Sequence, residues 1–288
     1  MSQFFRSYIQ YFIMRIIRII GFVMVSNIIY AQSGFNVATV TLSPVDQIIY
    51  YSLDFLEDSS GKDSKQEKMM LLVGKQVSMF TSYNYYLNDI AMKNLKNESA
   101  IQEWMMNPQN RPPTSRFLYK VYKNYPDGKI TFTDYVLPNF FKYEEDKTVA
   151  KWTLLTDTAT ISGYTCQKAT TSYGGRIWVA WFSIELPISD GPYKFGNLPG
   201  LIVKLHDTRH HYTFKMSSIE RPEEQLYIEL DERNYVKTTR EKFMKAEDSF
   251  REDIMNRIGS YGLSQETRQQ AKARISRQNN PIELDRSK

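Results

Sequence analysis

Short segments in which apolar and polar residues alternate fill the centre of the chain. They are rich in β-branched and aromatic residues, and turn residues separate them, which is typical of antiparallel strands. In chain order the segments are Phe35–Leu42, Gln47–Phe55, Arg116–Tyr122, Ile130–Val136, Trp152–Leu155, Gln167–Ser172, Arg176–Leu186, Leu201–His206 and Tyr212–Ile219. The pattern predicts a mainly β (β-rich α+β) fold, built as a curved antiparallel sheet, a sandwich or a partial barrel.

Local signals place the connections between these segments. Pro126-Asp127-Gly128 predicts a hairpin turn, because proline fixes φ and glycine supplies a positive φ. Asp207–His210 is predicted as a polar turn, and Glu144–Asp146 as a solvated turn. Asn84–Asn97 is a candidate helix.

The character of the chain changes at about Lys237, where charged residues and glutamine become dominant. Apolar residues then recur at helical spacing, at Phe243, Ala246, Phe250, Ile254 and Ile258. This stripe predicts a C-terminal helical segment that docks on the sheet or, in the alternative, binds a partner. The sequence thus divides into a β-rich domain (32–236) and a charged helical tail (237–288), whose final dozen residues are expected to fray.

The first residues have the composition of a secretory signal peptide. A basic region is followed by the apolar stretch Ile19–Ala31, which is too short to span a bilayer. Residues 1–31 are therefore predicted to direct export to the periplasm or cell surface, with cleavage between Ala31 and Gln32 and no transmembrane segment afterwards. The alternative is an uncleaved anchor, because Ile29 stands where a small residue is usual.

Charge narrows the range of partners. The whole chain carries +5, of which residues 1–31 supply +3 and residues 237–288 supply +4, so residues 32–236 carry −2. A basic face for nucleic acid is not indicated, and we predict no nucleic-acid partner.

Candidate chemistry is sparse. His206, His210 and His211 could hold a metal, although their spacing supplies no third ligand on one face, and a polar turn is the simpler interpretation. Cys166 is the single cysteine and is expected to be buried. We predict no catalytic residues and no cofactor. A metal-handling periplasmic protein and a hydrolase with an unrecognised site remain the alternatives.

Several spaced motifs occur together between Trp152 and Ile202. They include Ile161-Ser162-Gly163-Tyr164 with Cys166 and Lys168, Gly191-Pro192 with Lys194-Phe195-Gly196, and the hexapeptide Asn197–Ile202. This order of motifs resembles the GLPGLI family of exported Bacteroidetes proteins. The resemblance implies export and a β-rich fold, and it brings no catalytic residues. Asn197 replaces the first glycine of the named motif, which predicts a left-handed backbone there, because asparagine tolerates positive φ.

The loop that carries this hexapeptide displays large apolar residues between two strands. Its candidate binding residues are Tyr193, Phe195, Leu198, Pro199 and Gly200. The loop either plugs the open end of a curved sheet or lines a cavity that holds a ligand. We therefore expect a non-enzymatic envelope protein with an apolar groove for a lipid-like or peptide ligand, or for an outer-membrane partner.

Overall fold

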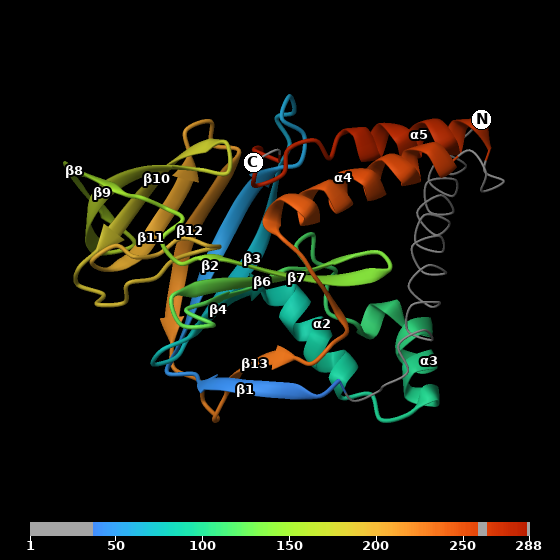
Figure 1. Cartoon of the computed structure of the whole chain (residues 1–288), viewed down its shortest axis with the longest axis horizontal. Helices are drawn as coiled ribbons and strands as arrows, with labels where there is room; N and C mark the ends of the chain where they lie inside the picture. Colours follow the sequence, from blue (N-terminus) through green and yellow to red (C-terminus); the bar gives the residue numbers. More distant parts are fainter. Residues whose placement is uncertain (1–36, 259–263, 287–288) are drawn as a thin grey trace.

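Twelve strands form one strongly curved sheet in the computed structural model, which describes residues 37–258 and 264–286 (Figure 1). The strand order is β14-β7-β6-β5-β4-β3-β2-β12-β11-β10-β9-β8, and all neighbours are antiparallel except β14 and β7. The predicted mainly β fold with a curved antiparallel sheet and a C-terminal helix is confirmed. β14 and β8 form the two edges, so the sheet stays open.

The strands of the large sheet are β2 (Gln47–Leu56), β3 (Ser64–Val73), β4 (Ser78–Ser82), β5 (Lys120–Lys123), β6 (Lys129–Val136), β7 (Asn139–Asp146), β8 (Thr153–Ile161), β9 (Tyr164–Tyr173), β10 (Arg176–Ser183), β11 (Leu201–Asp207), β12 (Tyr212–Glu220) and β14 (Tyr235–Lys237). A separate ribbon pairs β1 (Thr39–Pro44) with β13 (Tyr227–Asp231). The helical segments are α2 (Tyr83–Lys93), α3 (Glu98–Met106), the short η1 (Pro108–Asn110), α4 (Arg240–Arg257) and α5 (Gln265–Ser276).

Both faces of the sheet are buried at its centre, and β2 shows how the sequence divides them. Ile49, Tyr51 and Leu53 join a core cluster that also contains residues of β6, β7, β9 and β10. Strands from both ends of the sheet meet in this cluster, so it lies on the concave face. Ile48 and Tyr50 alternate with them and pack on the other face. The alternation follows from the two-residue period of a strand.

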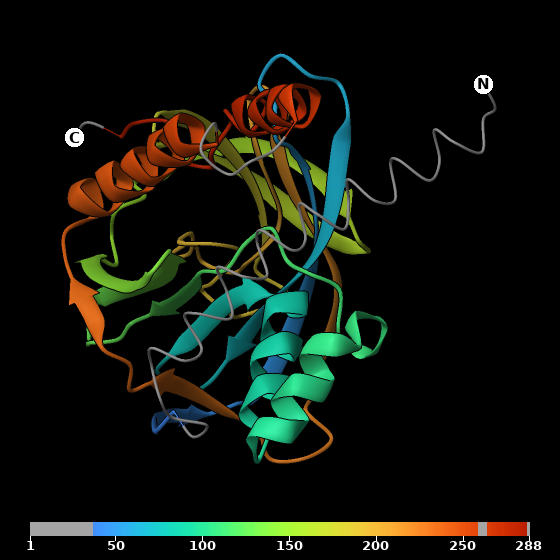
Figure 2. The ribbon, with the colours of Figure 1, turned by 90° about the vertical axis from the view of Figure 1, so that its right-hand side faces the viewer.

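Different elements cover the two faces (Figure 2). The β1–β13 ribbon supplies Ile228 and Leu230 to the convex side, where α2 also packs on β3 and β4. Helix α4 covers the concave side and inserts Phe243 and Met244 into its core. The stripe predicted for this helix therefore faces the sheet.

Several local predictions can be compared with the structure. β5 and β6 form the predicted hairpin, with Gly128 at φ 74°. The prediction of a solvated turn at Glu144–Asp146 is wrong, because these residues end β7 and pair with β6. The expectation that the tail frays after α5 is also wrong, since Asn280 and Glu283 are each only 3% exposed. The predicted signal peptide, with Ala31 and Gln32, lies outside the described residues.

Candidate functional site

The loop between β10 and β11 folds down onto the concave face. Tyr193, Phe195 and Leu198 are at most 2% exposed and belong to the core of that face, whereas Pro199 is exposed. Gly200 is buried against β10, where an added Cβ would lie 1.9 Å from the Ser183 carbonyl oxygen. These contacts agree with the plug interpretation of the loop. Asn197 has φ 63°, as its place in the hexapeptide predicted.

Two buried lysines hold this loop, and Lys123 of β5 is the first. Its ammonium group forms a salt bridge with Asp190 and donates hydrogen bonds to the backbone oxygens of Gly191 (2.5 Å) and Phe195 (3.2 Å). An ammonium group has three protons, and all three are used here. Ser78 also donates to Asp190. Burial lowers the pKa of Lys123, and the charge of Asp190 opposes that shift. This Ser–Asp–Lys group resembles hydrolase machinery in composition, and its contacts here tie the loop to β5.

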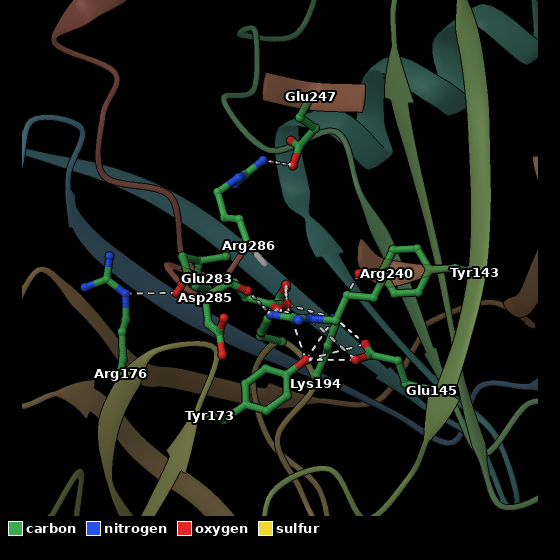
Figure 3. A network of polar contacts seen from close by, with 12 residues as sticks. Tyr143, Glu145, Tyr173, Arg176, Lys194, Arg240, Glu247, Glu283, Asp285 and Arg286 are labelled. Atoms are coloured by element: carbon green, nitrogen blue, oxygen red, sulfur yellow. Dashed lines mark hydrogen bonds and ion pairs between the residues drawn. The ribbon is translucent and has the colours of Figure 1, made fainter. Parts of the chain in front are cut away.

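Lys194 of the loop itself is the second lysine, and it is the centre of a buried polar network (Figure 3). Its side chain is 0% exposed and lies 2.5 Å from Glu145 and 2.8 Å from Glu283. It also donates to the hydroxyls of Tyr143 (2.9 Å) and Tyr173 (3.0 Å). A buried charge is tolerated when it is paired and fully hydrogen-bonded, and this one is.

Glu283 connects the network to the end of the chain. Its carboxylate accepts hydrogen bonds from Arg240 of α4 (2.6 Å) and from the Tyr193 hydroxyl. Burial would raise the pKa of Glu283, but Lys194 and Arg240 hold it at about 2. Burial would likewise lower the pKa of Lys194, but Glu283 and the neighbouring tyrosines raise it well above its usual value. Both groups are therefore charged at neutral pH, so the network fixes geometry and does not shuttle protons.

Residues 279–286, here called the C-terminal arm, lie along the concave face. Arg176 donates to Asn280 (2.7 Å) and to the Pro281 (2.7 Å) and Ile282 (2.9 Å) carbonyls, and it pairs with Asp207 (3.0 Å). The arm's backbone adds further bonds, including Leu284 N–H to the Gly174 carbonyl at 2.6 Å and Asn280 N–H to the Glu57 carbonyl at 3.1 Å. The arm thus occupies part of the concave groove as a bound peptide would.

A cavity of about 200 Å³ remains between the arm, α4 and the sheet, and we call it the aromatic cavity. Its aromatic lining is Phe55, Phe117, Tyr119, Phe132, Tyr135, Tyr143, Tyr193, Tyr212 and Phe243. Asp134, Glu247 and Arg286 are among its charged lining residues, and Arg286 pairs with Glu247 at 2.8 Å. The cavity lies near the loop, but charged and aromatic residues line it together, and Tyr193 is the one candidate loop residue in its lining.

Three polar groups of the aromatic cavity have unusual surroundings. Tyr119 is 5% exposed, and its hydroxyl has no hydrogen-bond partner among the described residues. Burial, together with the nearby charge of Glu247, raises the pKa of Asp134 well above its usual value. The Tyr135 hydroxyl, also in the lining, likewise has no hydrogen-bond partner among the described residues, and an unpaired hydroxyl can donate or accept a hydrogen bond. The cavity therefore combines an aromatic wall with unused polar capacity.

The three histidines do not form a complete metal site. The rings of His206 and His210 stack with centroids 4.3 Å apart, whereas His211 contacts Asn280 of the arm at 3.2 Å. Residues 37–258 and 264–286 contain no group of three or more histidine, cysteine or acidic residues placed to bind a metal. His210 has φ 55°, which fits the polar turn.

Cys166 lies in the core of the concave face and is 0% exposed. Burial raises the pKa of its thiol. Since the thiolate is the reactive form of cysteine, this environment does not activate it.

Sequence reasoning missed Glu145, Arg240, Glu283 and the arm. A usable signal was present, because Lys194 stands between the aromatic residues Tyr193 and Phe195 and a buried ammonium requires a carboxylate partner. In the tail, the corresponding signal was an acidic residue, Glu283, between the apolar residues Ile282 and Leu284. Nothing in the local sequence joins the two, because they are far apart in the chain.

The comparisons with known proteins bear on this region. Residues 174–204 match the model of a family described as "Protein of unknown function (Porph_ging)", which corresponds to the GLPGLI family of Bacteroidetes proteins. The chain carries the GLPGLI signature. The matched residues run from the β9–β10 turn through β10 and the Lys194 loop into β11, so the match includes the loop that both buried lysines hold. No curated protein matches the chain.

Similar solved structures include two of one protein and one of another, and each is distant from this chain in sequence. Structures of PNGF-II in two space groups each have 14% identity, a TM-score of 0.47 and coverage of 72% of this chain. The chain spans about a third of PNGF-II (34% and 33%). A LolA superfamily protein, NE2245 from Nitrosomonas europaea, has 7% identity and a TM-score of 0.26, covering 64% of this chain and 90% of that one. At such TM-scores the similarity assigns no activity. No helix among the described residues has the length and apolar character needed to cross a membrane.

Proposed function

We propose that this protein is an exported, non-enzymatic binding module of the cell envelope, whose aromatic cavity receives an aromatic side chain from a peptide segment of a partner protein. The observation that carries the proposal is the cavity itself, which nine aromatic residues line, among them Tyr119 with its unpaired hydroxyl. The fixed charges of the Lys194 network support binding over proton transfer.

Size favours a peptide side chain over a lipid. A cavity of about 200 Å³ is smaller than the roughly 300–1,000 Å³ of most ligand pockets. It exceeds the roughly 150 Å³ that accommodates a benzene ring in an apolar core. One ring fits, whereas a long acyl chain would have to displace the C-terminal arm.

The polar groups that line the aromatic cavity favour a ligand ring that carries a hydroxyl group. Tyr119 supplies an unpaired hydroxyl, and Asp134 supplies a carboxyl whose pKa burial raises well above its usual value. A tyrosine hydroxyl could exchange hydrogen bonds with both, while its ring packs among the aromatic residues.

The test uses N-acetyl-tyrosine amide as the peptide probe and dodecanoate as the lipid probe, both titrated calorimetrically into the purified full chain. Saturable binding of the tyrosine probe is expected. Met244→Trp should fill the cavity and weaken binding at least ten-fold. Ile177→Trp, at a position that is 56% exposed on β10, is the matched control and should bind as the parent does. Tyr119→Phe removes only the hydroxyl and should weaken binding several-fold.

Two results would reject the proposal. One is saturable binding of dodecanoate without binding of the tyrosine probe, which would indicate a lipid carrier. The other is equal binding of the tyrosine probe by the Met244→Trp and Ile177→Trp variants. Intact-mass analysis of the protein recovered from the envelope tests export separately, since a mature N-terminus at Gln32 is expected.

A further inference from the structure

A second cavity, of about 260 Å³, lies beside the same loop and shares no lining residue with the aromatic cavity. We call it the lysine cavity. The β3–β4 turn (74–77), the end of β5, Lys147 after β7 and loop residues 187–197 surround it. Four lysines line it, at positions 75, 123, 147 and 194, and Asp190 is its one acidic lining residue.

The charges of this cavity are unevenly compensated. Lys194 is neutralised by Glu145 and Glu283, and Lys123 by Asp190. Lys75 and Lys147 have no carboxylate partner among the described residues. The Lys147 ammonium donates a long hydrogen bond of 3.4 Å to the amide oxygen of Asn124. Two positive charges are therefore left at a concave site, where low-dielectric walls focus their field.

The backbone around Lys147 is well defined. Its N–H donates to the Gly128 carbonyl at 2.9 Å, and its carbonyl accepts from the Asn197 side chain at 2.7 Å. Asn124 and Asn197 have φ values of 62° and 63°, so both turns that border the residue are of the left-handed kind that asparagine tolerates. Asn124 is tied in turn to the Gln76 carbonyl at 3.0 Å. These bonds fix the backbone of Lys147 at the edge of the cavity.

We propose that the lysine cavity binds a compact oxyanion, a phosphate, sulfate or carboxylate group, between the ammonium groups of Lys147 and Lys75. The paired Lys123 and Asp190 form its neutral floor. Asp190 adds little repulsion, because its carboxylate already accepts from Ser78, Lys123 and the Gly191 N–H. The site is independent of the aromatic cavity and of the function proposed for it.

Inorganic phosphate, sulfate and acetate are the probes for this site. Thermal unfolding of the full chain is followed while each anion replaces chloride at constant ionic strength, because screening alone also alters the stability of charged proteins. A saturable rise in Tm is expected for at least one of the three anions. Lys147→Met and Lys75→Met should each weaken the fitted affinity at least ten-fold. Lys215→Met, an exposed lysine of β12 outside the cavity, should leave it unchanged.

The outcomes separate the two proposals. Loss of the phosphate effect in Lys147→Met with retention in Met244→Trp supports an anion site distinct from the aromatic cavity. A Tm that does not saturate with any anion, or an equal response of the Lys147→Met and Lys215→Met variants, would overturn the anion site. Neither of these last results would bear on binding of the tyrosine probe.

Discussion

Glu283→Gln removes one negative charge from the Lys194 network while keeping the shape of the side chain. In the folded protein the Glu283 pKa is about 2, compared with its ordinary 4.5, which corresponds to about 3 kcal/mol at about 1.4 kcal/mol per pH unit. Removing one partner of a buried ion pair generally costs about 3–5 kcal/mol. The two figures agree, so we expect the variant to lose about 3 kcal/mol of unfolding free energy at pH 7.

The stability difference between the parent and Glu283→Gln should depend on pH. The carboxyl has a lower pKa in the folded than in the unfolded chain, so its contribution is present above about pH 5 and is lost as the pH falls toward 2. The difference in stability between the parent and Glu283→Gln should therefore shrink by about half from pH 7 to pH 3.

Urea unfolding followed by fluorescence of the buried Trp178 measures both quantities. Glu241→Gln is the matched control, because Glu241 pairs with Lys245 in an exposed contact on α4 and its loss should change the stability little. The reasoning is refuted if the two variants are equally stable, or if the difference from the parent is the same at pH 7 and pH 3.

Three other changes test separate features. Gly200→Ala should destabilise the fold by about 3 kcal/mol or more, because the added Cβ would collide with the Ser183 carbonyl. Its control is Gly163→Ala, at an open turn with φ 86°, which should cost about 1 kcal/mol in the same urea assay. The buried Cys166 thiol should react with an aromatic disulfide reagent at least a hundred-fold faster in 8 M urea than in buffer, and rapid reaction in buffer would contradict its burial. Arg176→Lys should lower the unfolding free energy by about 2 kcal/mol and speed hydrogen exchange along the C-terminal arm, because one ammonium cannot reproduce the guanidinium contacts. Unchanged exchange would contradict the role of Arg176 in holding the arm.

The features that could be predicted from sequence are those with a local cause. The alternation in Gln47–Phe55 predicted β2 almost to the residue, and Pro126–Gly128 predicted the β5–β6 hairpin. The left-handed backbone at Asn197 could be predicted because few residues other than glycine and asparagine tolerate that conformation. In each case the signal and the structure lie within a few residues of each other.

The features that were missed depend on distant partners. Glu145 reads as part of a solvated acidic turn, yet it ends β7 beside a lysine of another loop. Glu283 lies in a polar tail, and only Lys194 and Arg240 make its burial favourable. β3 was also missed, because its first half is rich in charged residues and its pairing with β2 decides its conformation. Tertiary contacts override local preference in such segments.

The pairing of Lys194 with Glu283 also orders events during synthesis. The Glu283 carboxylate follows the Lys194 ammonium by 89 residues, so most strands of the sheet leave the ribosome before this lysine has its second carboxylate. A nascent chain that has reached only β14 can pair Lys194 with Glu145 but not with Glu283. It also lacks the C-terminal arm that Arg176 binds. The concave face is therefore completed last, when the arm arrives.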